Sequence, residues 1–187
     1  MIRPIRIYGD PVLHQRAAEV SVFDQELRDL VQDLFDTMDK APGVGLAAPQ
    51  IGVGLRVFVY SYPDDDETPR RGVVINPTLS HTPVEQGEAD EELESEGCLS
   101  FPGERFALKR GDRVLVEGVD LDQNPVHIEA EGWFARIFQH EFDHLNGILY
   151  VDKLPFGARK EAFEVMQDLG WNKPGVSWQP GVDNLED

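Results

Sequence analysis

The chain has 187 residues, of which 35 are Asp or Glu and 17 are Lys or Arg, giving a formal net charge of −18. This charge argues against sequence-independent binding to nucleic acid, which depends on basic patches. No apolar run approaches the roughly 20 residues that a membrane span needs, and the first residues lack the pattern of a secretory signal. We therefore expect a cytoplasmic protein with a single domain over residues 1–187.

An amphipathic helix is the first element that the sequence predicts, within residues 24–43. Asp24 is suited to cap its start, and Pro42 with Gly43 ends it. Apolar residues recur there at the helical period, which indicates one buried face. They are Leu27, Leu30, Val31, Leu34 and Met38.

Four short segments rich in β-branched residues are predicted to be strands. They are bounded by Gly, Pro, Asn and Asp, and they lie at residues 55–61, 71–77, 112–120 and 125–130. Acidic residues concentrate in 63–68 and 85–96, which we expect to form charged, solvated loops.

The segment 131–147 is predicted to be a helix of about four turns that ends at its final glycine. Apolar side chains surround nearly its whole circumference, and such a helix is normally enclosed by the rest of the domain. A C-terminal helix at 156–170 and an extended tail at 171–187, pinned by Trp171 and Trp178, are expected to follow. The fold class is therefore predicted to be α+β, with short, mostly antiparallel strands around a central buried helix.

The sequence QHEFDHLNG at residues 139–147 carries the clearest chemical signal. Residues four apart share one face of a helix, so His140 and His144 can direct their imidazoles at a common point. Glu141 lies about 100° further around the helix, where it can reach a water molecule on a metal rather than the metal itself. Two adjacent histidines in an apolar helix are costly to satisfy separately, and one metal ion satisfies both.

Three candidates compete to be the third ligand. The extended metalloprotease pattern requires a histidine where this chain has Tyr150, so that candidate fails. Glu164, with Asp168 beyond it, has the spacing of a thermolysin-like ligand but leaves the single cysteine unexplained. A thiolate from Cys98 with two imidazoles leaves one position of a tetrahedral site open for water, as a catalytic metal requires. We therefore predict Cys98 as the third ligand.

With Cys98 in place, the sequence resembles the peptide deformylase family over residues 1 to about 155. Three motifs carry the resemblance in order, namely GVGLAAPQ at 43–50, EGCLS at 96–100 and QHEFDH at 139–144. The resemblance implies a hydrolase that releases formate from N-formyl-L-methionyl nascent polypeptides, at or near the ribosome. It also implies one ion per chain, Fe²⁺ in most members with Zn²⁺, Ni²⁺ or Co²⁺ as substitutes, whereas ligand type alone suggests zinc.

The same resemblance implies roles for individual residues. Glu141 is expected to act as general base and then general acid, while Gln50 and the backbone N–H of Leu99 stabilise the oxyanion. An ion pair between Glu96 and Arg105 is expected to hold the active-site loops. A non-catalytic metal-binding module, the other class of protein considered, would need neither Glu141 nor Gln50. The remaining predicted residues contact the substrate, and they are Val44, Gly45, Gly97, Trp133 and Ile137.

Overall fold

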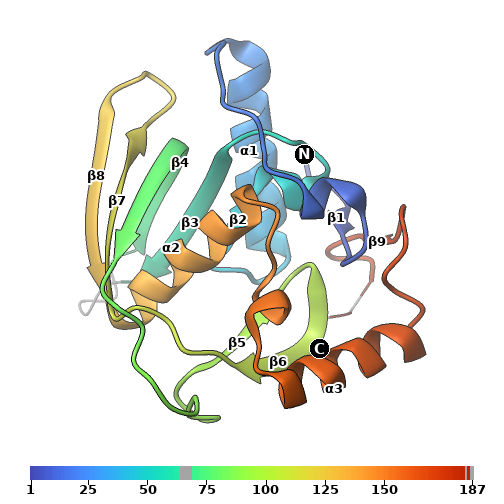
Figure 1. Cartoon of the computed structure of the whole chain (residues 1–187). Coiled ribbons are helices and arrows are strands. Elements are labelled where there is room, and N and C mark those ends of the chain that lie inside the picture. The colour runs from blue at the N-terminus through green and yellow to red at the C-terminus, as the bar shows by residue number, and fades with distance from the viewer. Residues whose placement is uncertain (64–68, 184, 186–187) are drawn as a thin grey trace.

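A five-stranded antiparallel sheet crossed by one helix organises the molecule (Figure 1). The computed structural model describes residues 1–63, 69–183 and 185, so the predicted acidic loop at 64–68 lies outside the described residues. The strand order is β2-β3-β4-β7-β8. Its strands are β2 (Gly45–Ala47), β3 (Val57–Pro63), β4 (Pro69–His81), β7 (Arg113–Val119) and β8 (Pro125–Glu131). The four predicted strands are thus confirmed as β3, β4, β7 and β8.

Three α-helices accompany this sheet in the described part of the chain, and the predicted α+β class is confirmed. They are α1 (Gln25–Lys40), α2 (Gly132–Leu145) and α3 (Phe156–Asp168), with short 3₁₀ helices η1 (Pro11–His14), η2 (Ala48–Ile51) and η3 (Tyr150–Lys153) between elements. The Asp24 carboxylate caps α1 as predicted, since it accepts a hydrogen bond from Leu27 N at 3.1 Å. No helix in the described part of the chain is both long and apolar enough to cross a membrane.

Four further strands pair in two small ribbons that the sequence did not predict. β5 (Ser95–Cys98) pairs with β6 (Phe101–Ala107), and β1 (Ile5–Arg6) pairs with β9 (Ser177–Trp178). The second ribbon joins the two ends of the chain. The tail thus contributes the short strand β9, in which Trp178 is buried, with 3% of its surface exposed.

Side chains of the sheet alternate between two hydrophobic cores because successive residues of a strand point to opposite faces. Val57 and Val59 of β3 belong to the core shared with α1, whereas Phe58 faces the core beneath α2. In β2, Leu46 and Ala47 divide in the same way. The sheet is thus covered by α1 on one face and α2 on the other, so α2 is enclosed as predicted (Figure 1).

The C-terminal end of α2 is fixed by several hydrogen bonds. Gly147 has a φ of +75°, its N–H donates to His144 O at 3.1 Å, and the next residue, Ile148, donates to Asp143 O at 3.0 Å. This is the glycine-based C-terminal cap that the sequence predicts. The Leu145 carbonyl also accepts from the buried Arg56 guanidinium at 2.9 Å. The last turn of α2 is therefore held in one position.

Replacing Gly147 with Ala tests this cap. Gly147 has a left-handed backbone conformation, which strains any other residue, and a Cβ there would lie 2.7 Å from Gln15 N. The substitution therefore costs both backbone strain and a steric clash. Gly132→Ala is the matched control, because its φ is +58° and nothing lies within 4 Å of the added carbon. In urea unfolding we expect Gly132→Ala to lose about 1–2 kcal/mol and Gly147→Ala to lose clearly more. Equal losses would contradict the clash.

Candidate metal centre

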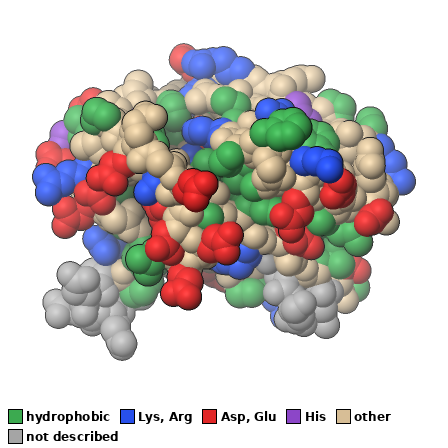
Figure 2. Space-filling model, turned by 60° about the horizontal axis from the view of Figure 1, so that its bottom comes forward, with side chains coloured by type: hydrophobic (Ala, Val, Ile, Leu, Met, Phe, Trp, Pro, Cys, Tyr) green, Lys and Arg blue, Asp and Glu red, His purple; other side chains and the backbone are tan. Residues whose placement is uncertain are grey.

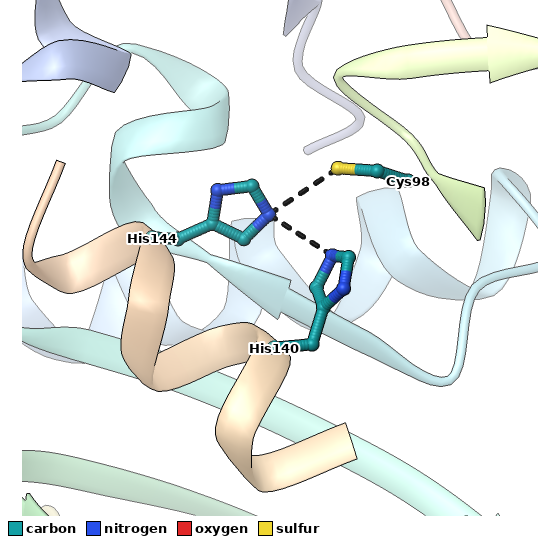
Figure 3. Close-up of side chains that lie close together, drawn as sticks. All are labelled: Cys98, His140 and His144. Atoms are coloured by element: carbon teal, nitrogen blue, oxygen red, sulfur yellow. Dashed lines mark hydrogen bonds between the residues drawn. The ribbon is translucent and has the colours of Figure 1, made fainter. Parts of the chain in front are cut away.

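Cys98, His140 and His144 converge on one point, two of them from helix α2 and one from the end of β5 (Figure 3). Cys98 Sγ lies 3.3 Å from His144 Nε2, and the two Nε2 atoms of the histidines lie 3.2 Å apart. All three ligand atoms are within 4.8 Å of one another. The predicted third ligand is therefore in reach of the imidazoles.

The arrangement fits a metal ion. An ion with tetrahedral bonds of about 2.0–2.3 Å places neighbouring nitrogen and sulfur ligands about 3.3–3.6 Å apart, close to the observed 3.2 and 3.3 Å. Burial lowers the pKa of His144 well below its usual range, so this ring is a neutral imidazole. Two nitrogens and a sulfur so close together in a buried space are suitable ligand atoms, and one ion shared among them would satisfy all three.

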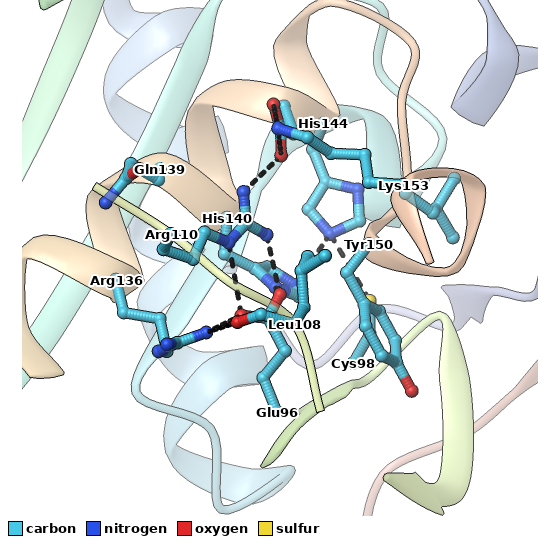
Figure 4. A network of polar contacts seen from close by, with 12 residues as sticks. Glu96, Cys98, Leu108, Arg110, Arg136, Gln139, His140, His144, Tyr150 and Lys153 are labelled. Carbon is cyan, nitrogen blue, oxygen red and sulfur yellow. Dashed lines mark hydrogen bonds and ion pairs between the residues drawn. The ribbon is translucent and has the colours of Figure 1, made fainter. Parts of the chain in front are cut away.

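A buried carboxylate, Glu96, lies directly behind His140 (Figure 4). Its oxygens contact His140 Nδ1 at 3.1 Å, Arg110 Nη2 at 2.6 Å and Arg136 Nη1 at 2.9 Å. Burial by itself would raise the pKa of Glu96, but the hydrogen bond from His140 and the charge of Arg110 bring it well below its usual range. The ionised carboxylate fixes the ring orientation of His140 and leaves Nε2 free for the ion, a common arrangement behind metal-binding histidines.

The predicted ion pair between Glu96 and Arg105 is wrong. Arg105 is exposed, and its guanidinium donates to the Ser95 carbonyl at 2.8 Å. The strand register explains this: Glu96 stands opposite Phe106, whereas Arg105 stands opposite Gly97. Because opposed residues share a face and successive residues alternate, Arg105 lies on the other face of the ribbon from Glu96.

Glu141 follows the first histidine and is 4% exposed. Burial raises its pKa to about 7, which is suitable for a group that must both accept and release a proton near neutral pH. One of its oxygens is buried without a hydrogen-bond partner among the described residues, so it is available to a water molecule or an amine. A Cβ at Gly45 would lie 2.4 Å from the other oxygen, so this position of β2 must be glycine for Glu141 to occupy its place.

Gln50 and Leu99 lie beside the Cys98 sulfur and line the same cavity as Glu141. The Gln50 side-chain oxygen accepts from Ala47 N at 2.9 Å, which directs its amide nitrogen toward Cys98 Sγ at 3.8 Å and Ser100 Oγ at 3.3 Å. Leu99 and Ser100 form the two-residue connection between β5 and β6. In such a connection the amide of the first residue is not used by the strand ladder, so the Leu99 N–H can serve a ligand.

A cavity of about 280 Å³ opens beside these groups. All five residues predicted to contact substrate line it, namely Val44, Gly45, Gly97, Trp133 and Ile137. Cys98, Leu99, Gln50, His140 and Glu141 line it as well. Arg105 reaches its rim, whereas His144 is not among the lining residues. The cavity therefore joins the ligands to an apolar wall supplied by α2.

The segment between β4 and β5 is rich in acidic residues. Figure 2 brings forward the lower side of Figure 1, along which this segment runs, and acidic side chains are scattered across that face. The predicted solvated loop is confirmed for residues 85–93, almost all of which are exposed. Glu94 is half-buried and pairs with Lys109 at 3.1 Å and Arg136 at 3.7 Å, so it belongs to the charge network behind the cavity.

Neither rejected ligand candidate approaches the cluster as a donor. Tyr150 is buried and its ring lies against that of His140, with ring centroids 6.0 Å apart. Glu164 lies on α3, is largely exposed and pairs with Lys160 at 3.4 Å. Among the described residues, the group that can hold an ion is Cys98, His140 and His144.

Sequence reasoning missed several residues that support the site. Arg110 bridges Glu96 and Asp143, and Gln139 binds both the N–H and the carbonyl of Gly111. One signal was present: Arg136 precedes His140 by four residues in an otherwise apolar helix, and a buried cation needs a carboxylate partner. No comparable signal marked Arg110, whose partners come from distant segments.

Three convergent ligands, a buried carboxylate beside them and an open cavity are the features of a hydrolytic metal centre. Residues 2–160 match the model of the polypeptide deformylase family. A peptide deformylase of Rhodococcus opacus is 48% identical over 185 residues, covering 97% of this chain and 94% of the relative.

Solved structures agree with this match. A peptide deformylase from Legionella pneumophila has a TM-score of 0.78 at 38% identity, covering 91% of this chain and 96% of that one. One from Synechococcus elongatus, in complex with actinonin, has a TM-score of 0.76 at 36% identity, covering 92% and 91%. The chain belongs to the polypeptide deformylase family. The predicted resemblance is confirmed, and with it the class of activity, a hydrolase that removes the formyl group from the N-terminus of newly made peptides.

Cys98→Ala tests the ligand set. Loss of an outer partner of a metal ligand costs about 10–100-fold in metal affinity, and we expect the loss of the sulfur ligand itself to exceed that. Metal titration followed by calorimetry measures it. Glu164→Ala is the control and should bind as the wild type does, because Glu164 pairs only with Lys160 in the described structure. The reverse result would favour a thermolysin-like site.

Arg110→Ala tests the charge network behind His140. Removing one partner of a buried ion pair leaves an uncompensated charge and typically costs about 3–5 kcal/mol, which urea unfolding should detect. Arg105→Ala, in the neighbouring exposed arginine, should change the free energy of unfolding by no more than about 0.5 kcal/mol. A larger loss of unfolding free energy in Arg105→Ala would support the ion pair between Glu96 and Arg105 that the structure contradicts.

Proposed function

We propose that this chain hydrolyses the formamide bond of N-formyl-L-methionyl peptides with a divalent cation held by Cys98, His140 and His144. The observation that carries the proposal is the 3.3 Å approach of the Cys98 sulfur to His144 Nε2, beside a buried glutamate. When bound, the ion supplies Lewis acidity that brings the pKa of a water molecule toward neutrality. We take residues 1–187 as one catalytic unit, because β1 and β9 pair at the two ends of the chain.

Glu141 moves the protons in this proposal. With a pKa of about 7 it is partly ionised at neutral pH, so it can accept a proton from the attacking water. The same carboxyl then delivers this proton to the departing amine nitrogen, and formate leaves with the hydroxyl oxygen. The absence of a side chain at Gly45 leaves the room that the Glu141 carboxylate occupies.

Gln50 and the Leu99 N–H stabilise the negative charge that develops on the formyl oxygen. Gln50 is buried, its oxygen is already bound by Ala47 N, and its amide nitrogen is directed toward Cys98 Sγ, so an N–H of this amide can serve the oxyanion without reorganisation. The apolar wall of the cavity, with Trp133 and Ile137, accepts the methionine side chain. Discrimination by apolar contacts is about 1–3 kcal/mol per methylene, so selectivity at this position is graded.

Fe²⁺ as the ion, with Zn²⁺, Ni²⁺ or Co²⁺ as substitutes, is the finer part of the proposal. A thiolate with two imidazoles suits several first-row divalent ions. Metal analysis of anaerobically isolated protein identifies the one bound. Nascent N-formylmethionyl polypeptides at or near the ribosome, in the cytoplasm, are the proposed physiological substrates.

Formate release tests the proposal directly. The anaerobically purified, iron-loaded protein should release formate from a formyl-methionyl tripeptide, and it should release no acetate from the acetyl analogue, which adds a methyl to the carbonyl carbon. Glu141→Gln is nearly isosteric but cannot accept a proton, so we expect turnover to fall about 10²–10⁴-fold at unchanged metal content.

Two outcomes would contradict this assignment. Metal binding without hydrolysis of any amide would favour a non-catalytic metal-binding module. Near-normal turnover of Glu141→Gln, with formate release intact in the wild type, would remove only Glu141 from the acid–base role.

A further inference from the structure

The turn that follows the cysteine ligand is held from outside by both ends of the chain. The Leu99 carbonyl accepts a hydrogen bond from Trp178 Nε1 at 2.8 Å, and the Ser100 carbonyl accepts one from Tyr8 N at 2.9 Å. Trp178 pairs with Ile5 in the β1–β9 ribbon, so the two donors belong to one small structural unit. Both carbonyls of the Leu99–Ser100 turn are thereby fixed.

Trp178 is built into this position. Its side chain is buried although Ser177 before it is exposed and Gln179 after it is only half-buried. A buried indole N–H needs an acceptor. The Leu99 carbonyl lies in a turn and is not used in the hydrogen-bond ladder between strands, so it can accept this hydrogen bond. Each group therefore satisfies the other.

Leu99 is also confined from the cavity side. A Cβ at Gly43 would lie 2.9 Å from Leu99 Cδ1, so the glycine-rich segment packs directly against the leucine side chain. With its side chain against Gly43 and its carbonyl bound to Trp178, Leu99 has little freedom to rotate. Its amide, which lies between these restraints and Cys98, is consequently held in one direction.

We propose that Trp178 is a positioning residue: its indole N–H binds the Leu99 carbonyl and thereby orients the Leu99 amide toward the substrate oxyanion. This inference rests on the proposed function, in which that amide stabilises the oxyanion. It gives the C-terminal tail a part in the chemistry. The sequence does not reveal this part, because the tail lies far along the chain from the three motifs. A donor aligned before the reaction costs no reorganisation when charge develops.

Trp178→Phe tests the proposal, because phenylalanine retains the aromatic packing and removes the donor. Deleting an oxyanion donor outright costs about 10²–10³ in kcat, so misorienting one should cost less, about 10-fold. We expect this fall in kcat on a formyl-methionyl tripeptide, with KM changed less than twofold and metal content unchanged. Trp171→Phe is the matched control from the same tail: its ring packs on Phe101 with centroids 5.1 Å apart, and its indole donates no hydrogen bond among the described residues.

The amide of Leu99 gives a readout that does not depend on activity. In ¹⁵N spectra of the metal-loaded protein, Trp178→Phe should shift the Leu99 amide resonance and speed its hydrogen exchange, whereas Trp171→Phe should leave both near wild type. Should Trp178→Phe fail to fold, 3-benzothienylalanine at position 178 replaces the N–H with sulfur at nearly the same volume and takes its place in both measurements.

Equal kcat values for the two phenylalanine variants would overturn the inference, as would an unshifted Leu99 amide in Trp178→Phe. If kcat and Tm fall together and by similar amounts in both variants, the tail contributes only packing. This result would also overturn the inference. Failure of the proposed function is distinguished separately: the wild type itself would then release no formate, whatever the spectra of the variants show.

Discussion

One buried carboxylate, that of Glu96, is the constraint on which the rest of the site depends. It contacts two guanidinium groups and the His140 imidazole, and these contacts tie together β5, the segment after β6 and helix α2. A carboxylate removed from water is stable only with such partners, so the three elements cannot move apart without exposing a bare charge. The same contacts orient His140. The position of its imidazole therefore depends on the pairing of the buried Glu96 charge with the two arginines.

Glycines and chain ends complete what the carboxylate begins. Gly45 leaves the space that the Glu141 carboxylate fills, and Gly147 allows the last turn of α2 to close beneath His144. The β1–β9 ribbon then braces the turn after Cys98 from the side away from the cavity. Side chains of the site, from positions as far apart as 50 and 144, are thus held by contacts within the molecule rather than by flexible surface side chains.

The helices and the ligands could be predicted from the sequence because each has a local signal. α1 shows the helical period with a capping aspartate, and His140 and His144 stand four apart on a helix that is apolar on nearly every side. β1 and β9 have only two residues each, too few for any period, and they exist only because they pair with each other. The partner of Glu96 could not be found by counting along the chain, because the register of β5 with β6 turns Arg105 to the opposite face and brings in Arg110.

The large negative charge of the chain has little influence on this chemistry. The acidic residues of 85–93 are exposed, and salt screens exposed charges beyond about 8–10 Å. Inside, Glu96 is matched by Arg110 and Arg136 at hydrogen-bonding distance, where screening is weak. The pKa of Glu141 is set mainly by burial, so its ionisation responds to its immediate surroundings rather than to the net charge of −18. The surface charge therefore acts on approaching molecules within about 10 Å of the surface, while the buried carboxyl groups keep ionisation states set by their own neighbours.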